Sequence, residues 1–184
     1  MFEVEDTRTV LVGWVKDAPG EPDLPEGWRF VHRIPREEER ALLETAFTGV
    51  DRPLGRGMPG YRDDSLLALV SDEKTIALGY LCERNEYGIE GRVGEGHYVV
   101  VHPDYRGQGA YQYLYAGLSV LARKWGLEGV AISTDRRGLA DVYVRWGAEV
   151  VRSGPKDEVK PITSGPRRSL ARRLGSRLRR MMQA

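Results

Sequence analysis

Hydrophobic residues along this chain follow two patterns: short apolar or alternating runs, and longer runs in which they recur every three or four positions. The short runs, bounded by Gly, Pro or charged residues, are typical of β-strands. They predict strands at 9–15, 28–32, 66–70, 76–81, 97–101 and 130–133, and the start of a last strand at 150. A five-residue polar connector joins the strands at 66–70 and 76–81, which predicts an antiparallel hairpin.

The three-and-four spacing is typical of helices with one buried face. It predicts helices at 35–47, from about 108 to 125, and at 139–146. The segment 85–96, rich in Gly and charge, predicts a long loop. Antiparallel strands followed by a β-α-β-α-β order predict an α/β fold with a mixed, mostly antiparallel central sheet flanked by helices.

Length and composition favour one domain, residues 1–162, in a soluble protein. The 184 residues are 41% hydrophobic and 30% charged, as in globular proteins, and no apolar run approaches the roughly 20 residues that span a bilayer. The acidic segment 1–6 lacks the basic and apolar parts of a secretory signal, so we expect a cytoplasmic location. The single cysteine, Cys82, allows no internal disulfide; it lies in an apolar run, which predicts a buried thiol. We expect no metal.

The C-terminal segment 163–184 differs from the rest in charge, because it holds seven arginines and no acid. Removing these seven charges from the formal net charge of +1 leaves −6 for the first 162 residues. Leucines and a methionine recur at helical spacing in this tail, which makes it basic and amphipathic. It predicts an anionic partner, either nucleic acid or a membrane surface; the alternative is a solvated tail that folds weakly around Gly175.

The most informative segment is the glycine-containing turn after the 97–101 strand. Gly107 and Gly109 let backbone N–H groups approach a bulky anion, and the following helix adds its unpaired amides and the positive end of its dipole. Arg106 adds a permanent charge. The segment lacks the Gly-Lys-Ser/Thr of a nucleotide-hydrolysing phosphate loop and the third glycine of a dinucleotide site. It predicts a diphosphate site, although a Gly-x-Gly pair also occurs in ordinary tight turns.

Two motifs resemble those of the GNAT superfamily of acyl-CoA N-acyltransferases. Val-x-Pro-x-Tyr-Arg-Gly-x-Gly at 101–109 resembles the acyl-CoA loop of that family. Ala-Asp-Val-Tyr-Val-Arg-Trp-Gly-Ala at 140–148 is similar to its second, downstream element, in which a helix carries a tyrosine and stops at a glycine. The motifs occur in the expected order, about thirty residues apart. The resemblance covers residues 66–151 well and residues 28–47 loosely.

The resemblance implies that acetyl-CoA is the co-substrate. In the family, the sheet splays beside the strand that carries the loop, so that the strand's backbone binds the pantetheine arm. That arm would lie against Val99, Val100 and Val101. The loop residues that would hold the pyrophosphate are Arg106, Gly107, Gln108, Gly109, Ala110 and Tyr111.

The resemblance also implies a catalytic set. Tyr143 stands where the family has the tyrosine that protonates the leaving thiolate; the alternative is a core aromatic, because Tyr143 belongs to an apolar helical stripe. His97 lies where some members have a basic histidine, and strand alternation puts Glu95 on the same face if the strand extends that far. The acceptor of the amine proton is therefore His97, Glu95 or water, and a solvated strand-end histidine is the alternative for His97.

Three positions depart from the family pattern. One alignment frame puts Asp104 at the first loop position, which is usually Gln or Arg. The other frame keeps Arg106 there and puts Tyr111 where Gly or Ala is usual. Arg136 takes the place of the family's common Asn before the last helix. These departures affect the contacts expected on the adenosine side.

The sequence as a whole predicts an N-acetyltransferase that moves an acetyl or short acyl group from acyl-CoA to a primary amine by direct attack. The acceptor is open: a small metabolite, a protein lysine or N-terminus, or a group on nucleic acid. Two alternatives remain. One is a degenerate acyl-CoA-binding module without turnover, and the other is a nucleic-acid-associated protein that acts through its basic tail.

Overall fold

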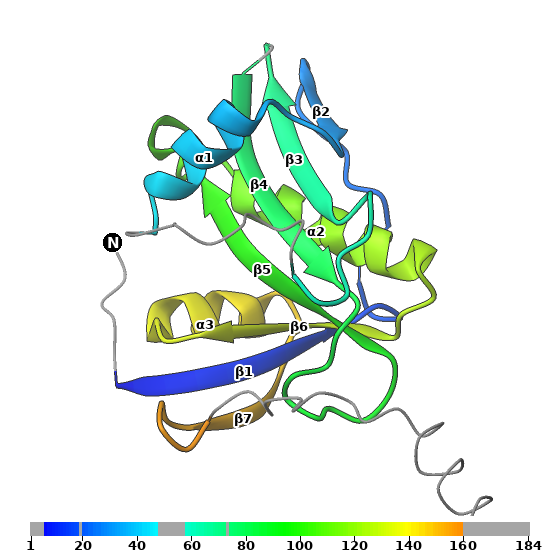
Figure 1. The fold of residues 1–184 in the computed structure, drawn as a ribbon, viewed down its shortest axis with the longest axis vertical. Coiled ribbons are helices and arrows are strands. Elements are labelled where there is room, and N and C mark those ends of the chain that lie inside the picture. Colours follow the sequence, from blue (N-terminus) through cyan, green and yellow to red (C-terminus); the bar gives the residue numbers. More distant parts are fainter. Residues whose placement is uncertain (1–5, 19, 48–57, 73, 160–184) are drawn as a thin grey trace, which may run out of the picture.

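The structure, a computed structural model, describes residues 6–18, 20–47, 58–72 and 74–159. Figure 1 shows how its elements are arranged. The strands are β1 (Thr7–Trp14), β2 (Trp28–Val31), β3 (Leu66–Ser71), β4 (Lys74–Cys82), β5 (Val93–Val101), β6 (Gly129–Thr134) and β7 (Glu149–Pro155). The helices are α1 (Arg36–Glu44), α2 (Ala110–Lys124), α3 (Arg137–Arg145) and a short 3₁₀ helix, η1 (Pro103–Tyr105). The basic tail lies outside the described residues.

The seven strands form one sheet in the order β2-β3-β4-β5-β6-β1-β7. Neighbouring strands are antiparallel throughout, except that β5 and β6 are parallel. This confirms the predicted mixed, mostly antiparallel sheet, and β3 and β4 form the predicted hairpin. The first strand of the chain lies between the last two, which the order of the sequence patterns did not indicate. Val10, Leu11 and Val12 of β1 are almost fully buried there.

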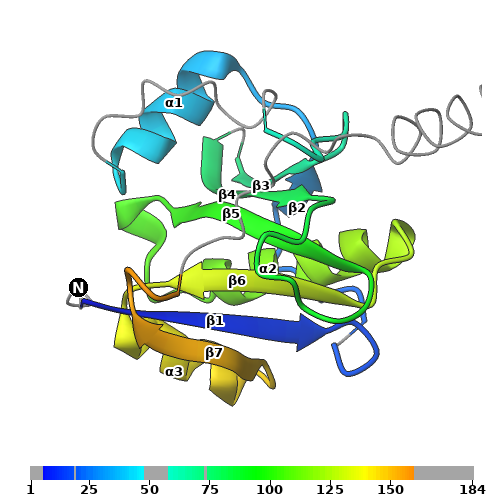
Figure 2. The same ribbon diagram turned by 60° about the horizontal axis from the view of Figure 1, so that its bottom comes forward.

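Helices cover both faces of the sheet, with α1 on one side and α2 and α3 on the other (Figure 2). In β3, Leu66 and Ala68 pack with the α1 side while Leu67 and Leu69 pack with the α2 side. A strand covered on both faces reads as a continuous apolar run, which is why β3 carries no alternation. In the part of the chain that the structure describes, no helix combines the length and apolar character needed to cross a membrane.

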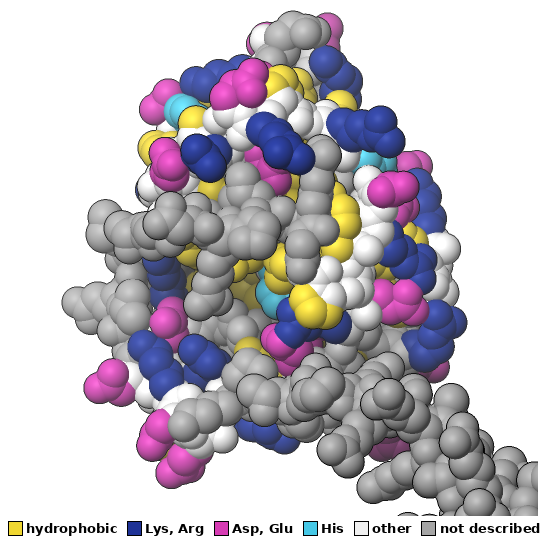
Figure 3. All heavy atoms as spheres, viewed as in Figure 1, with side chains coloured by type: hydrophobic (Ala, Val, Ile, Leu, Met, Phe, Trp, Pro, Cys, Tyr) yellow, Lys and Arg dark blue, Asp and Glu magenta, His cyan; other side chains and the backbone are white. Residues whose placement is uncertain are grey.

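The face that carries α1 shows side chains of both charge signs in Figure 3. Basic and acidic groups are interspersed over the described surface visible there, and hydrophobic side chains lie near its centre. Within this view, the described residues form no continuous patch of one sign. A charge pattern on this side therefore does not identify the acceptor.

The main error in the predicted elements concerns the start of β5. The segment 85–96 was expected to be a loop, but β5 begins at Val93. Two glycines weakened the strand pattern, since glycine is a poor strand former. The fold explains one of them: a Cβ on Gly94 would lie 2.7 Å from Leu127 Cδ1 and 3.0 Å from Leu81 Cδ1. A larger residue at this position would have to displace these two leucine side chains, which gives glycine a packing role inside this strand.

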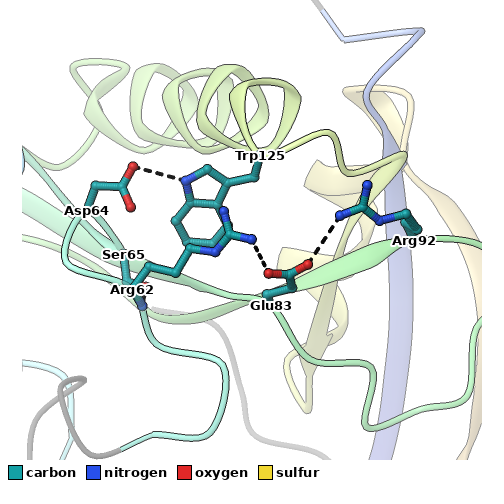
Figure 4. Close-up of polar contacts among 6 residues, drawn as sticks. All are labelled: Arg62, Asp64, Ser65, Glu83, Arg92 and Trp125. Carbon is teal, nitrogen blue, oxygen red and sulfur yellow. Dashed lines mark hydrogen bonds and ion pairs between the residues drawn. The ribbon is translucent and has the colours of Figure 1, made fainter.

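A group of polar contacts ties the loop before β3 to the end of α2 and to the beginning of β5 (Figure 4). The Arg62 guanidinium lies 4.4 Å from the centre of the Trp125 ring and pairs with Glu83. Arg92 also pairs with Glu83, at 3.3 Å. The Trp125 indole N–H donates to Asp64 at 3.0 Å. We refer to these five residues as the polar clamp.

Candidate active site

Strands β5 and β6 are paired only where they begin. The parallel register joins Val93, Gly94 and Glu95 to the first three residues of β6 and goes no further, although β5 continues to Val101. Figure 1 shows the two strands side by side at this end and diverging toward their carboxyl ends. In the described sheet, no strand pairs with β5 on the β6 side beyond Glu95. Backbone groups on that side are therefore open to a ligand.

A β-bulge lies where the two strands separate. Tyr80 pairs with His97 and Leu78 pairs with Val100, so two residues of β5 oppose one residue of β4. Within the bulge Tyr98 has φ +49°, an uncommon conformation for a residue with a side chain. Bulges bend a strand and redirect its side chains. The bend accompanies the divergence of β5 from β6.

The glycine turn leads from β5 into α2 as an anion-binding site requires. Gly107 and Gly109 have φ +79° and +82°, in the left-handed region that favours glycine. Gly109 caps α2 and its carbonyl accepts from the Tyr113 N–H at 3.1 Å. No side chain caps this end and the first turn holds no acid. The amides that begin α2 thus meet no side-chain acceptor, and the helix dipole adds positive potential.

The other predicted loop residues surround these amides. The exposed Arg106 donates from Nε to the Val101 carbonyl at 3.3 Å, which holds its guanidinium beside the turn. The Gln108 side chain donates to the Asp104 carbonyl at 3.0 Å. The helix begins at the buried Ala110, two residues later than predicted. The turn is therefore braced by its own side chains while its glycines remain exposed.

Helices α2 and α3 both begin beside the gap between β5 and β6. Each follows one of the two strands, so both start at the carboxyl ends where the strands have separated. Tyr111 lies in the first turn of α2 and Arg136 caps α3. Burial raises the pKa of Tyr111 to about 12, even though the Tyr143 hydroxyl and the Arg136 charge lower it. The charge of Arg136 at the start of α3 thus acts on Tyr111 at the start of α2.

Tyr143 is a core aromatic whose hydroxyl has a polar partner. Its side chain is 1% exposed, and its ring centre lies 5.3 Å from that of Tyr115 and 5.9 Å from that of Trp146. Its hydroxyl contacts the hydroxyl of Tyr111. Burial, together with the neighbouring phenols, raises the pKa of Tyr143 well above its usual value. The place in the apolar stripe that the sequence offered as the alternative is present, and the acid role stays a prediction.

His97 and Glu95 lie on one face of β5, as alternation required once the strand was seen to extend to Val93. His97 Nε2 lies 3.1 Å from Glu95 Oε2. Because a carboxylate only accepts, Nε2 carries the proton in this bond and Nδ1 is the nitrogen that can accept another. The structure therefore brings together two of the three predicted catalytic residues.

No sequence pattern indicated the groups that lie around the Glu95 carboxylate. Its carboxylate is 2% exposed and lies 3.5 Å from Arg84 Nε. It also accepts from the backbone N–H of Glu86. Ligand atoms of Glu86, Glu95 and His97 lie within 4.8 Å of one another. Arg84 contacts the carboxylates of Glu86 and Glu95, so its guanidinium places a positive charge beside these two acids.

A comparison with models of known protein families identifies the family of this chain. The model of the acetyltransferase (GNAT) family matches residues 28–148. The chain belongs to the GNAT family. The match includes the glycine turn, the diverging strands and Tyr143, and it confirms the resemblance read from the two motifs. No curated protein matches the chain.

Solved structures of GNAT proteins share the fold. A GCN5-related N-acetyltransferase from Kribbella flavida matches with a TM-score of 0.59 at 17% identity, over 83% of this chain and 57% of that chain. One from Sphaerobacter thermophilus gives 0.57 at 20% identity, over 83% of this chain and 50% of that chain. A glucosamine N-acetyltransferase region of a fungal multi-domain β-N-acetylglucosaminidase gives 0.59 at 22% identity, over 83% of this chain and 21% of that chain. The chain thus spans from about a fifth to somewhat more than half of the length of these three structures.

Proposed function

We propose that this GNAT protein is an N-acetyltransferase that moves an acetyl group from acetyl-CoA to a primary amine by direct attack. The observation that carries the proposal is the juxtaposition of an uncapped glycine turn at the start of α2 with the unpaired side of β5. An anion and an extended chain with amide groups both fit such a site. Acetyl-CoA offers both, in its pyrophosphate and its pantetheine arm.

Each part of acetyl-CoA has a binding element in this proposal. The amides from Gly107 to Tyr111 bind the pyrophosphate, with Arg106 beside them. The backbone of Val99, Val100 and Val101 binds the pantetheine amides, in the manner of a neighbouring strand. The thioester then lies in the gap between β5 and β6, where residues from both sides reach it.

On the amine side, His97 Nδ1 takes the proton, and Glu95 holds the ring through Nε2. Arg84 Nε lies 3.5 Å from Glu95 Oε2, so the buried carboxyl group has a cationic partner beside it as well as the His97 ring. On the thiol side, the Tyr143 hydroxyl is the acid group of the site. A covalent route through Cys82 is disfavoured, because this thiol is fully buried in β4 and burial raises its pKa to about 11.

Thiol release with a panel of amines tests the function. The panel should contain small amines, lysine peptides and glucosamine, which is the acceptor named for one structural neighbour. Acetyl-CoA should raise the melting temperature, and at least one amine should accelerate thiol release. A raised melting temperature without transfer to any amine would favour the degenerate binding module. No effect of acetyl-CoA at all would contradict the proposal.

A further inference from the structure

Tyr111 lies in the first turn of α2, after the carboxyl end of β5, and contacts the buried Tyr143. The resemblance read from the sequence gives Gly or Ala at this loop position, so a phenol here is a feature of this chain. The Tyr111 side chain is partly exposed, and its contact with Tyr143 joins the two hydroxyls. Tyr143 itself is 1% exposed. Of the two phenols, Tyr111 is therefore the one with side-chain surface that a ligand can reach.

We propose that Tyr111 is the group that gives its proton to the leaving sulfur, and that Tyr143 acts behind it as a positioning residue. This inference rests on the proposed function and refines the role given there to Tyr143. In this arrangement the Tyr143 O–H donates to the Tyr111 oxygen. The Tyr111 O–H is then free to point toward the sulfur.

The charges around the pair favour this direction of transfer. Burial raises the pKa of both phenols, and that of Tyr111, at about 12, is the one that a hydrogen bond from Tyr143 and the charge of Arg136 lower. The contact with Tyr111 instead raises the pKa of Tyr143. Tyr115 is the other phenol beside the pair, and it raises both pKa values. In the proposed arrangement Tyr111 gives up the proton, and the hydrogen bond from Tyr143 stabilises the phenolate that remains.

The proton balance closes without a further reagent. The amine nitrogen forms a C–N bond with the acetyl carbon, the C–S bond breaks, and the amine proton goes to His97 or water. The sulfur takes the Tyr111 proton. Tyr111 then recovers a proton from water, since its side chain is partly exposed, whereas a phenolate on Tyr143 would be sealed in the core. The net products are the amide and the CoA thiol.

The thiol pKa of bound CoA tests the inference without knowledge of the acceptor. The thiolate absorbance is titrated in the full chain bound to CoA, with a CoA analogue lacking the sulfur as the blank. A hydrogen bond from Tyr111 stabilises the thiolate. Its loss in Tyr111→Phe should raise the thiol pKa by about one to two units, the size of one hydrogen bond to a charged group. Tyr143→Phe should raise it by less.

Tyr115→Phe is the matched control. Its ring also packs against Tyr143 and Trp146, but its hydroxyl lies against Gly13 of β1, where an added Cβ would be 1.8 Å away. This variant should leave the thiol pKa unchanged. If Tyr111→Phe binds CoA normally and its thiol pKa is unchanged, the role proposed for Tyr111 is overturned while the proposed function stands. A larger rise in Tyr143→Phe than in Tyr111→Phe would return the donor role to Tyr143. Failure of the wild type to bind CoA would instead overturn the proposed function.

Discussion

The two ends of the β5–β6 pair are built in opposite ways. Where the strands begin, a parallel ladder joins them, and the Glu128 N–H donates to the Arg92 carbonyl while the Arg92 N–H donates to the Glu128 side chain. Arg92 also belongs to the polar clamp (Figure 4). Where they end, the ladder has stopped, and the helix that follows β5 starts without a side-chain cap. One end satisfies its polar groups internally and the other leaves them for a ligand. Internally paired and unpaired polar groups thus lie at opposite ends of the same strands, and only the unpaired end has backbone groups to offer a ligand.

Substitution in the glycine turn should have the largest effect, and it should fall on binding. Gly109→Val forces a branched side chain into φ +82°, with its Cβ 3.3 Å from the Tyr113 ring. The backbone N–H groups of the turn then no longer point toward the pyrophosphate site. Because each hydrogen bond to a charged group contributes about 1.5–3 kcal/mol, loss of two should weaken acetyl-CoA about a hundredfold or more, measured by calorimetry.

Gly27→Val is the matched control for backbone strain. Gly27 has φ +78° before β2, and an added Cβ meets only Asp72, at an ordinary 3.4 Å. It should lower the melting temperature without changing acetyl-CoA affinity. Equal loss of affinity in both variants would show that strain anywhere, rather than the turn, controls binding.

The base should give the next largest effect. A neutral imidazole accepts the amine proton and an imidazolium does not, so turnover should rise with pH if His97 is the base. His97→Ala should erase this rise, lower turnover by about a hundredfold on the alkaline side, and leave acetyl-CoA affinity nearly intact. Rate profiles against pH check this. A rise that persists in His97→Ala and disappears in Glu95→Gln would identify the carboxylate as the base.

Tyr111→Ala should have a smaller effect than Tyr111→Phe. Alanine removes the ring that contacts Tyr143, which should open the buried hydroxyl to the site, whereas phenylalanine keeps the ring and removes the donor. We expect about a tenfold loss of turnover for Ala and about a hundredfold loss for Phe. Adding Tyr143→Phe to Tyr111→Ala should lower turnover to about that of Tyr111→Phe, because the Tyr143 hydroxyl can then no longer replace the lost donor. Equal turnover of the Ala and Phe variants would argue against an access role for this position.

The polar clamp should give the smallest effect, on stability alone. Arg62→Ala loses the contact with Trp125, worth about 0.5–1 kcal/mol at an exposed site, which lowers the melting temperature by about 1–4 °C. The hydrogen bond from Arg62 lowers the pKa of Glu83 in the folded state. Because the folded-state pKa is lowered, the ionised Glu83 contributes to the free energy of unfolding at neutral pH. This contribution is lost as the pH falls and the carboxyl is protonated. The melting difference between wild type and Glu83→Gln should therefore shrink with acidification, while acetyl-CoA affinity stays unchanged in both variants.

Much of the site was predictable because its signals are local. Glycines at 107 and 109, followed by an apolar helical stripe, predicted a turn into a helix, and both glycines adopt positive φ. The placement of His97 and Glu95 on one face followed from strand alternation. The start of β5 was missed, because Gly94 has a packing reason that lies in Leu81 and Leu127 rather than in its neighbours in the chain.

Other features depend on contacts between distant segments. Glu39 in the first turn of α1 is 3% exposed and accepts from the Tyr80 hydroxyl, although a glutamate at a helix start is ordinarily exposed. Arg84 showed no sequence signal as the partner of Glu95. Each partnership joins groups whose chemistry is ordinary until the fold brings them together. Such contacts between distant segments cannot be read from one sequence, because it does not show which segments lie close together in the fold.

The sequence by itself determined the order of strands and helices, the buried faces and the glycine turn into α2, because these follow from periodicity and from backbone freedom within a few residues. Only the tertiary structure decided that β1 lies between β6 and β7, that β5 parts from β6 after Glu95, and that Tyr111 contacts Tyr143. The reason is physical. Strand pairing and side-chain contact depend on which distant surfaces exclude water together, and that choice is made by the whole chain at once.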